Sequence, residues 1–200
     1  MILLLDNYDS FTFILKDYLQ QCNEEVIVKE NTDSMEELLS LNFSKVLLSP
    51  GPKTPKQSGI LMPLVDYCAS HHIPTLGVCL GHQAIGEYFG GTLEKALRPM
   101  HGMVSKITHT EHPLFKNIPS LFEVCRYHSL IIKNIDNNEL ATIASSHEEE
   151  IMALAHQKLP LWGVQFHPEA IYTEHGLQLL KNWLTYCIPS EINQSLFNHS

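Results

Sequence analysis

Long hydrophobic runs and basic clusters are both missing from the sequence. The apolar stretch at the N-terminus, residues 1–5, ends at Asp6 and is too short for a membrane span or a signal-peptide core. The 13 Lys and Arg residues are outnumbered by 22 Asp and Glu residues, which gives a formal net charge of -9. A nucleic-acid surface needs clustered Lys and Arg to displace counterions from phosphates. We therefore expect neither a membrane nor a nucleic acid as a partner.

The cysteine and histidine patterns of metal and disulfide sites are also missing. The five cysteines are an odd number at irregular spacing, and no two are arranged as Cys-x-x-Cys. The 12 histidines are scattered, without His-x-x-x-His spacing beside an acidic residue. These absences predict a protein with free thiols, without a metal or cofactor, in the reducing cytoplasm.

The first half of the sequence does have a regular alternation of short apolar runs and longer amphipathic stretches. The runs predict strands at residues 2–5, 26–29, 46–48 and 75–78. The stretches between them predict helices at residues 11–22, 35–41, 61–71 and 80–89. This alternation is typical of an α/β fold, in which helices flank a doubly wound, mostly parallel central sheet.

After Gly91 the pattern changes to shorter alternating segments. They predict partly antiparallel strands, and so an additional short antiparallel sheet, at residues 104–107, 122–125, 140–144, 151–155 and 161–166. A final amphipathic stretch predicts a helix at residues 176–187, which Pro189 ends. The 200 residues are enough for one sizeable core. We expect one domain, residues 1–188, and a polar tail, residues 189–200.

The strongest local signal is a Gly-x-Cys-x-Gly sequence around Cys79, where a predicted strand meets a predicted helix. This is the cysteine form of a nucleophile elbow, because Gly77 and Gly81 leave room for a sharp turn that holds the sulfur clear of the sheet. The helix N-terminus favours a thiolate, and the backbone N–H of Leu80 can stabilise an oxyanion. A free cysteine is more often a small buried hydrophobic residue, but such a residue does not need flanking glycines. Cys79 is therefore a candidate nucleophile.

A candidate base lies at the end of the last predicted strand, in the triplet His167-Pro168-Glu169. His167 can take the thiol proton and return it, while Glu169 can orient the imidazole and stabilise its charged form. Alone, the triplet would suit a solvated turn equally well, but together with the elbow it favours catalysis. The other histidines are expected to be surface or capping residues, and they include His71, His72, His101, His112 and His128.

A third candidate element is the proline-rich loop at residues 49–55, after the third predicted strand. Ligands of doubly wound sheets bind outside the carboxyl ends of the strands, so this loop and Cys79 should open onto the same crevice. Gly51 allows its backbone N–H to approach an oxyanion closely. Without the other two motifs, an ordinary connection would be the simpler interpretation.

With these motifs together, the chain resembles the class I, or triad-type, glutamine amidotransferases, and among them the glutaminase subunits of anthranilate synthase and aminodeoxychorismate synthase. The motifs that carry the resemblance are LLLDNYDSFT (residues 3–12), SPGP (49–52), GVCLGHQAI (77–85), RYHSL (126–130) and QFHPE (165–169). They extend over nearly the whole chain. Five motifs in the same order make chance agreement improbable.

The resemblance implies a triad of Cys79, His167 and Glu169 that attacks the side-chain amide of L-glutamine, releases ammonia and hydrolyses a glutamyl thioester. It also implies that the ammonia passes to a larger, chorismate-using synthase subunit in a hetero-oligomer. The residues that it assigns to glutamine and its oxyanion are Gly51, Pro52, Lys53, Leu80, Gln83, Ser129 and Leu130.

Three positions depart from the family pattern. Relatives often carry glycine in place of Lys53, lysine in place of Met103 and serine in place of Ala170. Lys53 is tolerable if only its backbone faces glutamine. Met103 and Ala170 bear on the contacts with the partner and on the geometry of the His167 turn. Two alternatives stay open: an inactive regulatory or binding subunit of the same fold, and a cysteine hydrolase that acts on another amide.

Overall fold

The computed structural model describes residues 1–187, and the predicted tail, residues 189–200, lies outside them. The strands are β1 (Ile2–Asp6), β2 (Val26–Glu30), β3 (Lys45–Leu48), β4 (Thr75–Val78), β5 (Thr92–Lys95), β6 (Met103–His109), β7 (Leu121–Arg126), β8 (Leu130–Lys133), β9 (Leu140–Ser146), β10 (Ile151–His156) and β11 (Leu161–Val164). The helices are α1 (Thr12–Gln21), α2 (Met35–Leu39), α3 (Leu61–Ser70), α4 (Leu80–Tyr88) and α5 (Gly176–Tyr186), with short 3-10 turns η1 (Pro55–Gln57) and η2 (Pro113–Phe115). The boundary of the domain at residue 188 stays a prediction.

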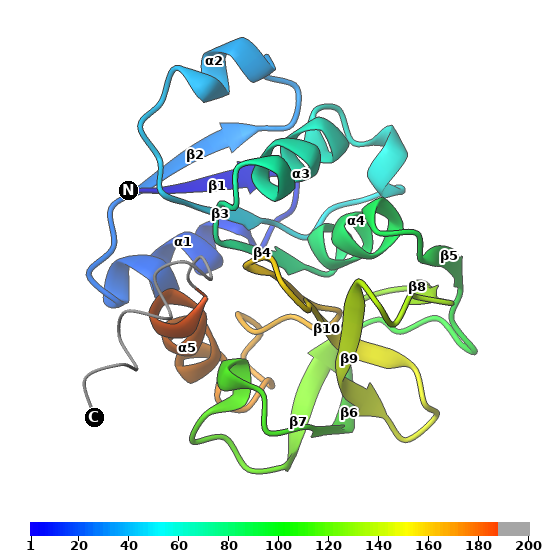
Figure 1. Ribbon diagram of the computed structural model, residues 1–200. Helices are drawn as coiled ribbons and strands as arrows, with labels where there is room; N and C mark the ends of the chain where they lie inside the picture. Colours follow the sequence, from blue (N-terminus) through cyan, green and yellow to red (C-terminus); the bar gives the residue numbers. More distant parts are fainter. Residues whose placement is uncertain (188–200) are drawn as a thin grey trace.

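The central sheet has nine strands in the order β2-β1-β3-β4-β11-β10-β9-β6-β7 (Figure 1). The first five of these strands are parallel to one another, and from β11 onward each strand is antiparallel to the next. Strands β5 and β8 form a separate two-stranded antiparallel sheet. The predicted fold class is confirmed, and so is each strand and helix proposed from the sequence. The strands expected to form the additional antiparallel sheet instead join the central sheet. Strands β5 and β8 were not predicted: β5 (TLEK) has one apolar residue, and no strand was assigned to the short apolar run of β8 (LIIK).

Strand β1 shows why the first half of the chain forms a two-faced parallel sheet. Ile2 and Leu4 pack in one hydrophobic core with α1 and α5, whereas Leu3 and Leu5 pack in a second core with α3 and α4. All four side chains are buried. A strand that is covered on both faces needs apolar residues at every position, not only at alternate ones. The unbroken apolar run at the N-terminus is therefore a central strand.

The order of the strands determines where a ligand can bind. The chain leaves β1 for β2 on one side and later returns to β3 on the other, so the connections diverge at the carboxyl ends of β1 and β3. Such a divergence opens a crevice in doubly wound sheets. The segments that follow β1, β3, β4 and β11 begin at Asn7, Ser49, Cys79 and Gln165. The predicted site elements thus share one edge of the sheet.

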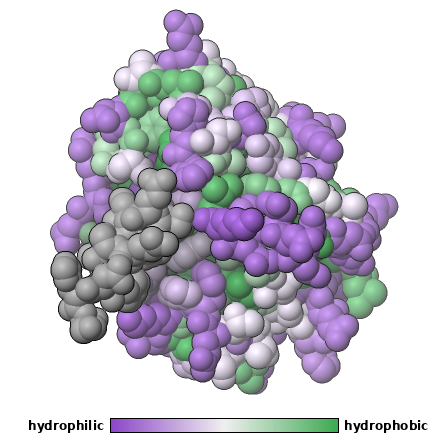
Figure 2. All heavy atoms as spheres, in the orientation of Figure 1, coloured by the Kyte–Doolittle hydropathy of each residue, from purple (hydrophilic) through white to green (hydrophobic). Residues whose placement is uncertain are grey.

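On the face drawn in Figure 2, hydrophilic residues are spread over the molecule and apolar ones are visible in smaller patches between them. Within residues 1–187, no helix combines the length and the hydropathy that crossing a bilayer requires.

Candidate active site

Cys79 lies at a strained turn between β4 and α4. Its backbone has φ 50° and ψ -95°, a conformation that residues other than glycine rarely adopt. A Cβ on Gly77 would lie 2.3 Å from the carbonyl carbon of Gly81, and a Cβ on Gly81 would lie 2.5 Å from the carbonyl oxygen of Leu48. The two glycines are therefore required by packing, which lets α4 begin directly against the ends of β3 and β4. This is the elbow geometry that the sequence predicted.

His167 and Glu169 form a buried pair beside Cys79. His167 Nδ1 lies 2.7 Å from Glu169 Oε1, and both side chains are almost completely buried. Burial disfavours the imidazolium, but interactions with Cys79 and with Glu169 outweigh it and raise the pKa of His167 to about 10. A protonated His167 next to the sulfur stabilises a thiolate, which is the nucleophilic form of cysteine.

The turn that carries His167 is attached to the outer edge of β7. The His167 N–H donates to the Cys125 carbonyl (3.0 Å). The Thr173 hydroxyl donates to the His167 carbonyl (2.6 Å) and accepts from the Cys125 N–H (2.9 Å). Glu174 adds two further bonds to the Glu123 backbone. Because β7 is the last strand of the sheet, these contacts satisfy backbone groups at its open edge and hold the His167 turn in place.

The inner side of the same turn packs against α5. A Cβ on Gly176, the first residue of α5, would lie 1.8 Å from the Pro168 carbonyl oxygen. Two aromatic rings approach the His167 imidazole edge-on, with centroid distances of 5.1 Å for Tyr127 and 5.6 Å for Phe11. The turn is thus enclosed on several sides, which limits the rotation of the imidazole.

A pocket of about 210 Å³ opens above Cys79. Its lining consists of Gly51, Pro52, Lys53, Cys79, Gln83, Tyr127, His128, Ser129 and Leu130. It therefore contains every residue predicted to bind glutamine except Leu80. The Leu80 side chain is buried under the Gly51 loop, and the role predicted for this residue belongs to its backbone N–H.

Asn7 holds the Gly51 loop against the end of β1. Its N–H donates to Ser49 Oγ (2.8 Å), and its side-chain amide donates to the Ser49 carbonyl (3.0 Å). A Cβ on Gly51 would lie 2.6 Å from Asn7, so only glycine fits there. Lys53 has φ 69° and an exposed side chain, so its backbone adopts the left-handed conformation that glycine prefers. The sequence motif contained Asn7, but no role was predicted for it.

Gln165 is a site residue that the sequence reasoning missed. It is fully buried, and its amide nitrogen lies 3.5 Å from the Cys79 sulfur. Its amide oxygen accepts from Gln83 Nε2 (3.2 Å), which also donates to the Leu130 carbonyl (3.0 Å). The two glutamines thus connect Cys79 to the pocket wall. Gln165 stands two residues before His167 on the same chain segment, and that position was the only available signal.

The prediction of a surface or capping role was wrong for His128. This side chain is buried, because Arg126, with no exposed surface, donates from Nε to His128 Nε2 (3.1 Å) beneath the β7–β8 connection. The capping role is confirmed for His112, whose Nδ1 accepts from the Leu114 N–H. The prediction was also wrong for His82, which is fully buried. It is confirmed for His71, His72 and His101, which are exposed.

The described residues offer no metal site. Among residues 1–187, no group of three or more His, Cys, Asp and Glu side chains is arranged to hold a metal ion. All five cysteines are free. His82, on the helix after Cys79, is buried, which lowers its pKa to about 4 and keeps it neutral.

Known proteins with similar sequences belong to one family. The family model for glutamine amidotransferase class-I matches residues 3–187. Anthranilate synthase component 2 of Azospirillum brasilense is 46% identical over 92% of this chain and 95% of its own. Aminodeoxychorismate synthase component 2 of Klebsiella aerogenes is 44% identical over 92% of this chain and 99% of its own. The Bacillus subtilis relative, named aminodeoxychorismate/anthranilate synthase component 2, is 42% identical over 92% of this chain and 95% of its own.

A solved structure shares the whole architecture. A protein of Thermoplasma acidophilum that carries the name of a GMP synthase component superposes with a TM-score of 0.84 at 25% identity, covering 98% of this chain and 96% of that one. The family match, the elbow and the sheet order agree with one another. The chain therefore belongs to the class I glutamine amidotransferase family.

Proposed function

We propose that this chain is the glutaminase subunit of a chorismate-using synthase, which hydrolyses L-glutamine through Cys79, His167 and Glu169. The observation that carries the proposal is the position of the elbow. Cys79 opens into a pocket lined by Gly51, Gln83 and the backbone after His128, directly beside the buried His167–Glu169 pair. Relatives at 42–46% identity are named as component 2 of anthranilate or aminodeoxychorismate synthases.

The proposed reaction has two halves. The Cys79 thiolate attacks the amide carbon, and the carbonyl electron pair moves to oxygen, where the N–H groups of Leu80 and Gly51 stabilise the negative charge. His167 donates its proton to the nitrogen as the C–N bond breaks, so ammonia leaves and a thioester remains. A water molecule then attacks the thioester and gives a proton to His167, the C–S bond breaks, and glutamate leaves.

Strand β8 supplies the wall that would hold glutamine. The Ala96 N–H donates to the Ser129 carbonyl (2.9 Å), and Lys95 lies opposite Leu130. In an antiparallel pair, backbone groups point alternately toward and away from the neighbouring strand. The N–H and carbonyl of Leu130 therefore point away from β5 and toward Gln83, where a free N–H can bind the substrate.

An exposed apolar surface next to Glu169 is the proposed contact with the larger subunit. We call it the Tyr172 patch, and it surrounds a groove of about 340 Å³ lined by Phe11, Ile14, Tyr18, Tyr127, Glu169, Ala170, Ile171 and Tyr172. Ile171 is 89% exposed and Tyr172 is 68% exposed. Large apolar side chains that are exposed side by side are typical of protein interfaces. A partner here would contact the catalytic turn itself.

The test is ammonia release by the purified chain, titrated with chorismate and with either an anthranilate-forming or an aminodeoxychorismate-forming subunit. We expect weak turnover alone, strong turnover with at least one partner, and glutamine-dependent product. The partner that activates the chain identifies the pathway. Cys79→Ser should abolish the glutamine-dependent reaction and retain the reaction with ammonium salts, because only the glutaminase step is lost.

The same titration separates the two alternatives. An inactive binding subunit would support the ammonium reaction without any glutamine turnover. A cysteine hydrolase for another amide would turn over glutamine poorly with either partner. The free cysteines further support a reducing compartment such as the cytoplasm as the location of the complex.

A further inference from the structure

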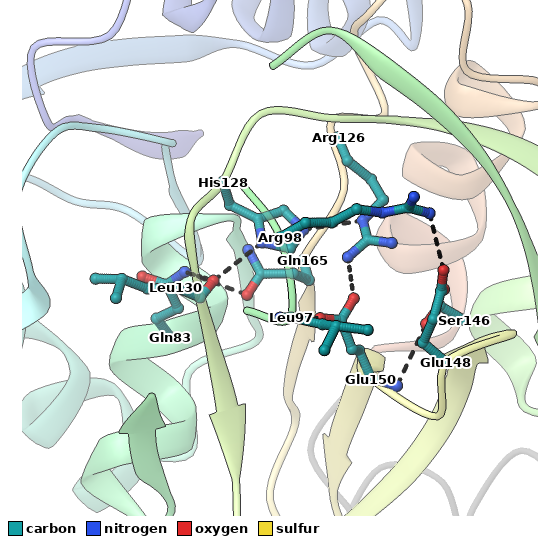
Figure 3. A network of polar contacts seen from close by, with 10 residues as sticks. All are labelled: Gln83, Leu97, Arg98, Arg126, His128, Leu130, Ser146, Glu148, Glu150 and Gln165. Atoms are coloured by element: carbon teal, nitrogen blue, oxygen red, sulfur yellow. Dashed lines mark hydrogen bonds and ion pairs between the residues drawn. The ribbon is translucent and has the colours of Figure 1, made fainter. Parts of the chain in front are cut away.

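His128 is the centre of a buried polar chain that reaches the proposed glutamine pocket (Figure 3). On one side, Arg126 donates from Nε to His128 Nε2 (3.1 Å) and forms an ion pair with Glu150. On the other side, His128 Nδ1 lies 3.0 Å from the Leu130 carbonyl. That carbonyl also accepts from Gln83 Nε2 (3.0 Å). This series of polar contacts therefore ends at the wall of the pocket.

The hydrogen bonds determine which nitrogen of His128 carries the proton. Arginine can only donate, so His128 Nε2 must accept. The ring proton is then on Nδ1 and is donated to the Leu130 carbonyl. Burial and the nearby charge of Arg126 lower the pKa of His128 to about 3, so the ring stays neutral at physiological pH. A neutral ring with both nitrogens engaged can orient its neighbours but has no proton to exchange with a substrate.

The other end of this series of polar contacts, at Glu150, lies close to the surface. Glu150 is 7% exposed, and its second carboxylate oxygen accepts from the Leu97 N–H (3.2 Å). The next residue, Arg98, pairs with Glu148 at the surface (2.9 Å). Figure 3 shows Glu148 on the opposite side of Arg126 from Gln83 and Leu130. The carboxylate of Glu150 thus fixes Arg126, and Arg126 fixes the ring.

We propose that His128 is a positioning residue for glutamine, held by the Arg126–Glu150 pair. By donating to the Leu130 carbonyl, it sets the orientation of the Leu130 backbone and of the Gln83 amide, and these two groups face the substrate. The proposal rests on the function proposed above. It assigns to the buried ion pair a role in substrate affinity, not in the chemical step.

Two substitutions at position 128 separate the two hydrogen bonds of the ring. The amide nitrogen of asparagine can take the place of Nδ1, so His128→Asn can retain the donor to the Leu130 carbonyl. The longer glutamine side chain reaches the Nε2 position, so His128→Gln retains the contact with Arg126 and loses that donor. We expect His128→Gln to raise KM for glutamine about tenfold, because one buried hydrogen bond is lost, and to leave kcat nearly unchanged. His128→Asn retains that donor without the support of Arg126, so its KM should rise less than the KM of His128→Gln.

A second variant tests the role of the Arg126–Glu150 ion pair without leaving a buried charge. The double substitution Arg126→Met with Glu150→Met replaces the ion pair by apolar side chains of similar length, a change that buried ion pairs often tolerate. His128 then loses its support, and KM should rise as it does in His128→Gln. The matched control is Arg98→Ala, which breaks the exposed ion pair nearby and should leave KM unchanged. Thermal unfolding of each complex shows that the fold is retained.

The measurement is steady-state glutamine turnover by the complex with its activating partner, across a range of pH. A wild-type KM in folded His128→Gln and in the folded double variant would overturn the proposal. Equal losses in His128→Asn and His128→Gln would also overturn it, as would a changed pH profile of kcat in His128→Asn. A wild-type complex without any glutamine turnover would instead overturn the proposed function, and this inference with it.

Discussion

The nucleophile and the base of the candidate site are held in place by different means. Cys79 is held by local packing, because the glycines two residues before and after it leave no space for a Cβ. His167 is held by hydrogen bonds to a distant strand, including the bond between Thr173 and Cys125, which are 48 residues apart. Packing at the elbow excludes any added Cβ, whereas the edge contact depends on individual hydrogen bonds to the completed sheet. The nucleophile should therefore tolerate few substitutions nearby, and the base should respond to single hydrogen bonds.

The largest effect should come from the base itself. His167→Ala removes the group that moves the proton and should lower kcat/KM for glutamine by about 10⁴-fold or more. Glu169→Ala removes only the group that orients and stabilises the imidazolium, so we expect a loss at least about tenfold smaller. Steady-state kinetics of the complex measure both. A larger loss in Glu169→Ala than in His167→Ala would mean that the roles are assigned wrongly.

A methyl group in the elbow should cost stability as well as activity. Gly77→Ala places a Cβ 2.3 Å from the Gly81 backbone, and we expect it to lower the free energy of unfolding by about 3 kcal/mol. Gly90→Ala is the matched control, since Gly90 has open space around it and only its φ of 87° is unfavourable to alanine, which costs about 1 kcal/mol. Chemical denaturation of the purified chain gives both values. Equal costs at the two positions would contradict the packing account of the elbow.

One hydroxyl group should matter to the base turn. Thr173→Val keeps the shape of the side chain but leaves the Cys125 N–H and the His167 carbonyl without their partner. We expect kcat to fall about tenfold. Thr173→Ser retains the hydroxyl and should recover most of this loss. If valine and serine give the same kcat, hydrogen bonding to β7 does not position the base.

The smallest effect should come from the Gly51 loop. Lys53 adopts φ 69°, which favours glycine, so Lys53→Gly should raise the free energy of unfolding by up to about 1 kcal/mol and leave the KM for glutamine unchanged. Lys53→Ala, the control, retains the strain and should give no such gain. A large rise in KM in both variants would show that the Lys53 side chain binds the substrate.

The fold and the elbow at Cys79 were predictable because their signals lie in short stretches of sequence. Continuous apolar runs identified the buried parallel strands, and the glycines around Cys79 identified the elbow. Strand β5 gave no such signal, because a four-residue segment with one apolar residue does not establish a period, and β8 is paired only with β5. The buried position of His128 depends on Arg126, whose burial follows from an ion pair with Glu150, 24 residues further along the chain. The contacts of Thr173 and Gln165 likewise exist only after the strands have come together.

The most direct test of the account is covalent labelling of the chain with an electrophilic glutamine analogue, followed by mass spectrometry of its peptides. All five cysteines are free, so each of them could react. The account predicts one label per chain, on Cys79, blocked by excess glutamine and formed far more slowly in His167→Ala. Labelling of another cysteine, or labelling of Cys79 that glutamine does not prevent, would contradict it.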